Sequence, residues 1–411
     1  MTAEQRVTYR SVLSNREFAA IAAGTGLSVL GDQLARIAIA VLVYQRTNSA
    51  FAASATYAIS YLTYLLGGPL LSALSDRYRR LTVMVVCDVA RAPLLLALCL
   101  PGVPLWCVFA VLIAVGALAP PFDSARSGLQ PDILPGDAYV VGSAILNLIF
   151  QTAQVLGLVA GGALVALISV RGALALDAAS FLISGGLMLA AVMQRPPAQR
   201  KAERSTLYRD TLSGLRLVTH TPQLRRLLAY ALLGSAAVIA PEGLAVPVAR
   251  SLGGGALEAG LLTASVPAGF LVASAFVLRV DPERRTALLP WLALLGCVPL
   301  LFTAQAGSPV LVGLLWFVAG AGGSVNLIAS AAFIQACPRE FRSRAYGVAV
   351  TSLYAVQGLV LLLAGALAGP LSATQSVAAM ALLTLVLLGV MVARDKEGSQ
   401  GNSDLVRSTS G

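Results

Sequence analysis

The chain has 411 residues, of which 57% are hydrophobic and only 12% charged, and its mean hydropathy is +0.80. A water-soluble domain of this size carries far more charge on its surface, so the composition excludes one and indicates a membrane protein. The five cysteines contain no CxxC pair, which argues against a zinc site or a disulfide scaffold.

Long apolar stretches predict membrane spans along the whole chain, because about 20 helical residues cross about 30 Å of hydrocarbon. Lipid offers backbone groups no partner outside the helix, so we expect an all-α integral membrane fold. Twelve spans are predicted, in two sets of six. The first set is 17–44, 51–74, 82–100, 104–121, 139–168 and 173–193. The second set is 224–249, 257–279, 287–305, 309–336, 346–368 and 373–393.

The two sets predict two six-helix bundles, at 1–193 and 224–393, with a polar linker between them. The linker, 194–223, contains "QRPPAQRKAERS" and then an amphipathic stretch near Leu207–Val218. We expect that stretch to be a helix along the cytoplasmic surface. Residues 394–411 are polar and are predicted to form a disordered cytoplasmic tail.

Basic residues orient the predicted spans. With the N-terminus inside, most of the 29 Lys and Arg residues fall in cytoplasmic segments, as the positive-inside rule requires. Both termini are therefore predicted to be cytoplasmic. The net charge of +10 is explained by this topology, and we do not expect nucleic-acid binding.

The two halves repeat each other. "DRYRR" begins at Asp76 and "DPERR" at Asp281, 205 positions later, while Gln154 and Gln357 are 203 positions apart. These nearly equal offsets favour a duplicated, pseudo-symmetric six-helix unit. Parallel repeats of this kind place a substrate cavity between the halves, near the bilayer midplane.

A charged cluster lies between spans two and three and comprises Asp76, Arg77 and Arg80. These groups can pair with each other, with neighbouring helix ends, or with Asp88 deeper in span three. Such pairs hold one arrangement of the halves and release in another, which is a cytoplasmic gate. Alternatively, the cluster is a basic loop that orients the spans and reaches to lipid headgroups. Its second-half copy is Asp281, Arg284 and Arg285.

Ionisable residues also lie inside the predicted spans. Arg36 follows Asp32 by four residues, so an ion pair within the helix is available. Glu242 in span seven lies at nearly the depth of Asp32, so the two carboxylates are predicted to face each other across the cavity. A carboxylate in a partly desolvated cavity takes up a proton more readily than one in water, which suits a coupling role. The alternatives are a structural Asp32–Arg36 pair and a Glu242 at the outer rim. Asp177 in span six is expected to pair structurally, with Arg171 or with span-three charges.

Neutral polar residues complete the predicted cavity. Asn147, Gln151 and Gln154 lie on one stripe of span five, where they either line water or bind helices together. Further cavity candidates are Gln33, Arg36, Asn326 and Gln357. A small-residue face that favours close helix packing consists of Gly157, Gly161 and Gly162.

Twelve spans, a basic central loop and "GPLLSALSDRYRR" (68–80) resemble the major facilitator superfamily. Its loop signature reads G-x-x-x-D-R-x-G-R-R, of which Asp76, Arg77 and Arg80 are kept. "LSVLGDQLARIAIAVLVY", "LDAASFL" and "PREFRSRAYG" are similar to the branch of bacterial drug, macrolide and siderophore exporters. The resemblance implies two pseudo-symmetric six-helix bundles, and a gate at Asp76, Arg77 and Arg80 that latches the outward-facing state.

The sequence contains no catalytic constellation and no metal-ligand cluster, so we predict neither an enzyme nor a cofactor. It also lacks the ATP-binding motif GxxxxGK[ST], so we predict that a gradient supplies the energy. The prediction is a monomeric, proton-coupled exporter of an amphipathic small organic molecule. An importer or a lipid flippase on the same fold is the alternative. A non-transporting receptor or assembly factor is the third possibility.

Overall fold

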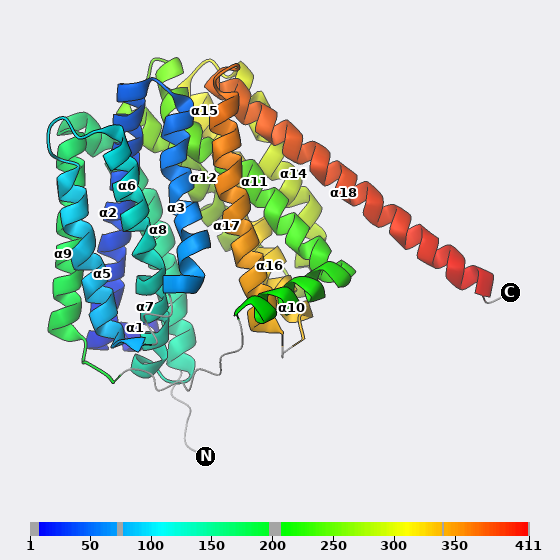
Figure 1. Cartoon of the computed structure of the whole chain (residues 1–411). Helices are drawn as coiled ribbons and strands as arrows, with labels where there is room; N and C mark the ends of the chain where they lie inside the picture. Colours follow the sequence, from blue (N-terminus) through cyan, green and yellow to red (C-terminus); the bar gives the residue numbers. More distant parts are fainter. Residues whose placement is uncertain (1–7, 72–76, 197–206, 339–340, 410–411) are drawn as a thin grey trace.

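The computed structural model describes residues 8–71, 77–196, 207–338 and 341–409, and within these ranges the chain is helical, without a β-strand (Figure 1). The first half contains α1 (Tyr9–Leu13), α2 (Arg16–Thr47), α3 (Ala50–Leu71), α5 (Arg80–Ala97), α6 (Leu105–Ala117), α7 (Ala119–Ile133), α8 (Asp137–Leu167) and α9 (Val170–Ala191). The second half contains α10 (Leu207–His220), α11 (Pro222–Ser251), α12 (Ala256–Val277), α13 (Pro282–Arg285), η1 (Thr286–Leu288), α14 (Leu289–Leu301), η2 (Phe302–Gln305), α15 (Pro309–Gly322), α16 (Val325–Ala336), α17 (Arg342–Leu367) and α18 (Ala373–Thr409).

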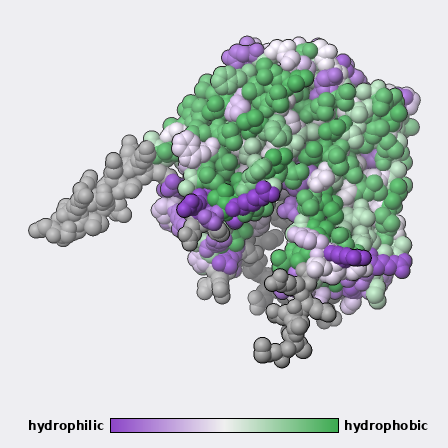
Figure 2. Space-filling model, turned by 180° about the vertical axis from the view of Figure 1, so that it is seen from behind, coloured by the Kyte–Doolittle hydropathy of each residue, from purple (hydrophilic) through white to green (hydrophobic). Residues whose placement is uncertain are grey.

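The predicted all-α membrane fold is confirmed. Within the described residues, 10 helical segments are long and apolar enough to span a bilayer. The two further predicted spans coincide with α3 and α5, which are more polar: α3 carries several Tyr, Ser and Thr residues, and α5 carries Arg80, Asp88 and Arg91. The count of twelve thus depends on these two helices. Hydrophobic side chains cover the middle of the molecular face in Figure 2, as contact with lipid chains requires.

The fourth span of each half is broken. In the first half α6 ends at Ala117 and α7 begins at Ala119, and in the second half α15 ends at Gly322 and α16 begins at Val325. The predicted end of span four at residue 121 is therefore wrong, because the helix continues to Ile133. Two prolines near the start of α7 explain the break: proline disrupts the interior of a helix, but it fits the first turn of a new one.

The halves contact each other mainly along two helix pairs, α3 with α17 and α8 with α12, and α11 also packs against α3. Glycines permit the second contact: a Cβ at Gly162 would lie 2.6 Å from the Ala256 carbonyl oxygen and 2.9 Å from Gly260 Cα. Gly157 and Gly161 instead face α2, where a Cβ would lie 2.7 Å from the Leu30 oxygen and 3.0 Å from Leu34 Cα. The predicted glycine face therefore packs against two helices, one from each half.

Two ends of the bundle are distinguished below. The arginine-rich end carries Arg80 and Arg195, near the start of α2, and the far end is the opposite one, where α2 ends and α3 begins. Ser54 at the start of α3 donates a hydrogen bond to the Gly243 carbonyl oxygen of α11 at 3.0 Å. A Cβ at Gly365, near the end of α17, would lie 2.8 Å from Ser54 Cβ. The halves are thus in direct contact at the far end.

The structure agrees with the predicted linker helix but not with the predicted tail. A helix, α10, lies where the amphipathic stretch is predicted, and it packs against α17 and α11. The domain boundaries remain predictions. The tail prediction is wrong, since α18 continues as one helix to Thr409 instead of ending in disorder at residue 394 (Figure 1). Extending a formed helix is much easier than nucleating one, so a polar segment that follows a membrane helix can continue it.

Candidate functional site

A cavity of about 280 Å³ lies between the halves and is called the central cavity below. Its polar lining comes from α3, α8, α11, α12, α16 and α17 and comprises Tyr61, Gln151, Gln154, Ser235, Glu242, Thr263, Asn326 and Gln357. Its apolar walls include Leu158, Val238, Ile239, Val266, Phe270 and Leu353. Few polar groups on mostly apolar walls suit an amphipathic organic molecule.

Four predicted cavity residues, Gln151, Gln154, Asn326 and Gln357, come together in this lining. Gln357 Nε2 donates to Ser235 Oγ at 2.7 Å, so its amide is fixed within its own half. The Asn326 side-chain oxygen is buried and has no hydrogen-bond partner among the described residues. Asn147 is exposed and is not part of the lining, although it shares the stripe on α8.

One ion pair joins the halves beside this cavity. Arg36 Nη1 of α2 lies 3.2 Å from Glu242 Oε1 of α11, with side-chain exposures of 27% and 14%. Tyr61 of α3 donates its hydroxyl to Glu242 Oε2 at 3.0 Å. The predicted Asp32–Arg36 pair is therefore replaced by a pair between halves. Asp32 and Arg36 share a helix face, but only the long arginine side chain reaches α11.

A second cavity, of about 150 Å³, lies within the first half. Asp32, Gln33 and Arg36 line it from α2, together with Arg91 from α5 and Asp177 from α9. It shares no lining residue with the central cavity. The prediction that Asp32 and Glu242 face each other across one cavity is therefore wrong: the short Asp32 side chain stays within its own half.

Arg91 is central to this second cavity and received no role from the sequence. It is 3% exposed, its Nη1 lies 3.7 Å from Asp88 Oδ1, and its guanidinium lies over the rings of Phe122 and Phe181 at 5.5 and 5.1 Å. The sequence did contain a signal that would have found Arg91: it is a charged residue inside a predicted span, and such a residue is a candidate functional residue by default.

Asp177 also lies in the second cavity, 1% exposed, and Ser180 Oγ donates to its Oδ1 at 3.2 Å. Of its two predicted partners, Arg171 is not part of this cavity, whereas the span-three cation Arg91 is.

Asp123 of α7 is a further group that the sequence did not single out, because it follows the predicted end of span four and was placed in a loop. It accepts a hydrogen bond from Tyr64 Oη at 2.6 Å and pairs with Arg126 at 2.9 Å.

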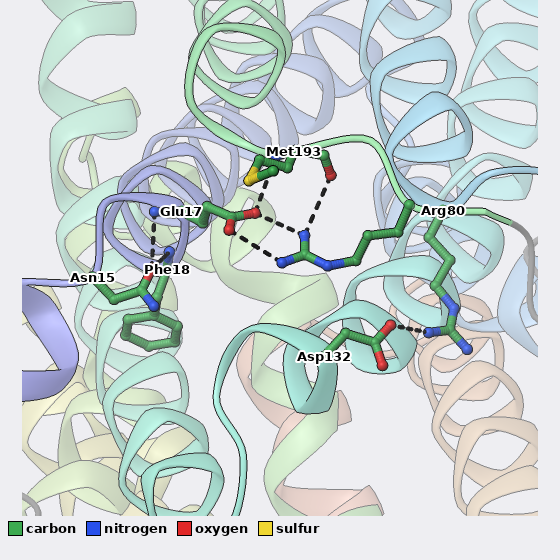
Figure 3. Close-up of polar contacts among 7 residues, drawn as sticks. Asn15, Glu17, Phe18, Arg80, Asp132 and Met193 are labelled. Atoms are coloured by element: carbon green, nitrogen blue, oxygen red, sulfur yellow. Dashed lines mark hydrogen bonds and ion pairs between the residues drawn. The ribbon is translucent and has the colours of Figure 1, made fainter.

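At the arginine-rich end, Arg80 binds the end of α7. Its Nη1 donates to Asp132 Oδ2 at 2.7 Å (Figure 3). The same nitrogen donates to the Gly128 carbonyl oxygen at 2.6 Å. The proposed partner Asp88 is instead beside Arg91, two helical turns deeper. Arg77 is exposed, with its guanidinium 5.9 Å from the Tyr78 ring. Asp76 lies outside the described residues.

The second-half copy makes different contacts. Arg285 donates from Nε to the Val280 oxygen at 2.9 Å and from Nη2 to the Leu278 oxygen at 2.8 Å, at the end of α12. A cation is favourable at this helix end, where carbonyl groups carry partial negative charge. Asp281 and Arg284 are exposed. Arg80 thus connects two helices, whereas Arg285 caps the helix that precedes its own loop.

A further contact at the arginine-rich end joins α2 to the end of the first half (Figure 3). Arg195 donates to both oxygens of Glu17, at 2.7 and 3.1 Å, and the Met193 amide donates to Glu17 at 3.0 Å. Asn15 caps α2 by accepting from the Glu17 and Phe18 amides. This bidentate pair fixes the point where the linker begins.

The class of protein follows from this geometry: two contacting helical halves with a cavity between them that carries a few polar groups form a secondary-transporter architecture. In the part of the chain that the structure describes, no group of three or more His, Cys, Asp or Glu side chains is placed to hold a metal ion. Residues 21–335 match the family described as Major Facilitator Superfamily, and the chain belongs to this family.

Among curated relatives, the multidrug efflux pump Tap of Mycolicibacterium fortuitum is 25% identical over 394 residues, which cover 91% of this chain and 93% of Tap. The uncharacterized MFS-type transporter YfiS of Bacillus subtilis (strain 168) is 23% identical over 352 residues, which cover 81% of this chain and 82% of YfiS. The similarity thus extends over most of each protein.

Solved structures share the fold at lower identity. The nucleoside transporter NupG aligns with a TM-score of 0.72 and 14% identity, covering 92% of this chain and 98% of NupG. A POT family transporter in complex with 5-aminolevulinic acid aligns with a TM-score of 0.71 and 12% identity, covering 92% of this chain and 96% of that one. The protein is therefore a multi-pass membrane transporter of the major facilitator fold.

Proposed function

We propose that this transporter is a proton-coupled secondary exporter of amphipathic small organic molecules, working as a monomer by alternating access in a bacterial inner membrane. The observation that carries the proposal is the Arg36–Glu242 ion pair, which joins the halves beside a cavity of about 280 Å³. A pair of this kind closes one side of the cavity while it exists and opens that side when one partner is neutralised or displaced.

The orientation comes from the basic residues. The positive-inside rule assigns the arginine-rich end to the cytoplasm, so the far end, where Ser54 and Gly243 are in contact, faces outward. The described arrangement is then closed to the outside, and substrate enters the central cavity from the cytoplasm. We assign Arg77 and Arg80 to a cytoplasmic gate that forms in the opposite arrangement, with Arg284 and Arg285 as its second-half counterpart.

The cavity lining supports the proposed substrate class. Four amides, from Gln151, Gln154, Asn326 and Gln357, offer donors and acceptors on walls that are otherwise apolar. Such walls bind molecules with an apolar body and a few polar groups, and they discriminate weakly among them. The full-length similarity to a multidrug efflux pump supports this substrate class and the outward direction.

Transport by the purified protein in proteoliposomes tests the proposal. An imposed pH gradient is expected to drive accumulation of ethidium, tetracycline or erythromycin, accompanied by counterflow of protons. Glu242→Gln is expected to abolish the coupling, whereas Asp137→Asn, at an exposed position at the start of α8, is the matched control. Transport of a substrate in the same direction as protons would instead make the protein an importer. Translocation of labelled phospholipid without transport of these compounds would make it a flippase.

A further inference from the structure

A polar chamber inside the first half is separate from the central cavity. The 150 Å³ cavity is adjacent to a smaller one of about 60 Å³, and both are lined by Asp32, Tyr64 and Arg91. All residues of the two linings belong to α2, α3 and α5 to α9. Neither cavity shares a lining residue with the central cavity, so the chamber can hold a different ligand from the transported molecule.

Buried polar atoms face this chamber without protein partners. Among the described residues, Thr25 Oγ1, Gln33 Oε1 and the Arg91 Nε and Nη2 atoms have no hydrogen-bond partner, and the three residues are 1%, 5% and 3% exposed. Buried polar groups are normally satisfied by protein or by water. A polar space of this size holds several water molecules, so the unsatisfied atoms indicate a hydrated chamber.

The charges in and beside the chamber do not balance. Asp88 lies next to Arg91 at 3.7 Å, and Asp123 pairs with Arg126 at 2.9 Å. Asp32 and Asp177 have no cation of their own at ion-pair distance among the described residues, because Arg36 is held by Glu242. The titratable and charged groups that share these cavities with Asp32 are Arg36 from α2, Tyr64 from α3, Arg91 from α5, Asp123 and Arg126 from α7, and Asp177 from α9, and Asp88 of α5 interacts with Asp32 through its charge.

Asp32 and Asp177 are also close together. Asp177 Oδ1 lies within contact distance of the position that a Cβ on Gly31, the chain neighbour of Asp32, would take, and both aspartates line the same cavity. Two neighbouring carboxylates in a buried site repel each other strongly, and one proton shared between them removes most of that repulsion. The geometry therefore favours a site that holds a proton.

We propose that Asp32 and Asp177 form a carboxyl pair that binds the coupling proton within the first half, and that its charge decides whether Arg36 pairs with Glu242 or with Asp32. This inference rests on the proposed proton-coupled export. Arg36 lines the chamber and also reaches Glu242, and it follows Asp32 by four residues, so both partners lie within reach of its side chain.

The order of events then gives exchange of proton and substrate. With the proton bound, Asp32 is neutral, Arg36 stays with Glu242, and the far end is closed, as in the described arrangement. Release of the proton restores a carboxylate that competes for Arg36, and the far end opens. Asp123, which is 38% exposed and hydrogen bonded to Tyr64, lies on the path from the chamber to solvent.

Infrared spectroscopy of the intact protein in lipid tests the carboxyl pair directly and needs no substrate. The wild type is expected to have a carboxylic-acid C=O band that disappears as the pH is raised. Asp32→Asn and Asp177→Asn should each remove this band, whereas the exposed Asp137→Asn should leave it unchanged. Glu242→Gln should keep the band but lose it at a lower pH than the wild type, because Arg36 is then free to pair with Asp32. Asp177→Glu, which restores a carboxyl group, should recover it and so exclude a loss due to misfolding.

A band that survives in Asp177→Asn, or that disappears only in Glu242→Gln, overturns the carboxyl pair. These outcomes are distinguishable from failure of the proposed export function, which is measured separately as pH-driven ethidium transport. A second readout is the distance between spin labels at the far end. Asp32→Asn is expected to keep the far end closed at every pH, while the wild type opens as the pH rises.

Discussion

Removing the charge of Glu242 should open the far end of the transporter. Glu242→Gln keeps an oxygen that can accept the Tyr61 hydrogen bond but leaves Arg36 without its anionic partner. A charge-assisted hydrogen bond contributes about 1.5–3 kcal/mol, and both side chains are mostly shielded, so we expect a loss of about 2 kcal/mol. Since about 1.4 kcal/mol is a tenfold change, the ratio of far-end-closed to far-end-open molecules should fall about thirtyfold.

Spin labels at Gln45 and Ser251 measure this ratio, because both residues are exposed and lie at the far end, on α2 and α11. With the native cysteines replaced, the distance distribution of Glu242→Gln should gain a longer component that the parent protein lacks. Arg36→Gln should give the same component, and Asp137→Asn should not. An unchanged distribution in both Glu242→Gln and Arg36→Gln would refute the reasoning that this pair holds the halves together.

Three further predictions test the packing and the cavity. Gly162→Ala should lower stability by about 1–3 kcal/mol in thermal unfolding, because its Cβ would lie 2.6 Å from a carbonyl oxygen of α12; Gly186→Ala, with nothing within 4 Å, is the control that should not. Oxidation of a Ser54→Cys/Gly243→Cys variant should stop ethidium transport until a reductant is added, since the two Cβ positions are 3.1 Å apart; transport after complete oxidation would contradict closure at this point. Gln151→Leu should change the relative transport rates of ethidium, tetracycline and erythromycin about fivefold, which is the equivalent of one hydrogen bond. Relative rates that are the same in the variant and the wild type would exclude a contact between Gln151 and substrate.

Hydropathy and charge were sufficient to predict the fold, because membrane spans depend on local composition. The error at span four has a local cause: Pro120 and Pro121 read as the end of a helix, although they lie in the first turn of the next one. The tail beyond residue 393 has the composition of a disordered segment, yet it continues a helix that the membrane span has already nucleated.

The candidate site was predictable where one helix determines it. The helical spacing of Gln151 and Gln154 placed both on one face, and both line the central cavity. The partner of Arg36 was not predictable, because Glu242 lies 206 positions away and only the packing of the halves brings the two together. A local rule, the spacing of Asp32 and Arg36 by four residues, suggested a different partner, and the longer reach of arginine decided the outcome.

The break in the fourth span occurs at the same point of both halves, yet it borders a different cavity in each half. Gly116 and Ala119, beside the first break, line the chamber of Asp32, whereas Gly320 and Gly323, beside the second, line the central cavity. Irregular backbone at membrane depth persists only where protein or water satisfies it. Under the proposed mechanism, one duplicated irregularity of the backbone serves two sites: the first copy borders the site proposed for the proton, and the second borders the site proposed for the substrate.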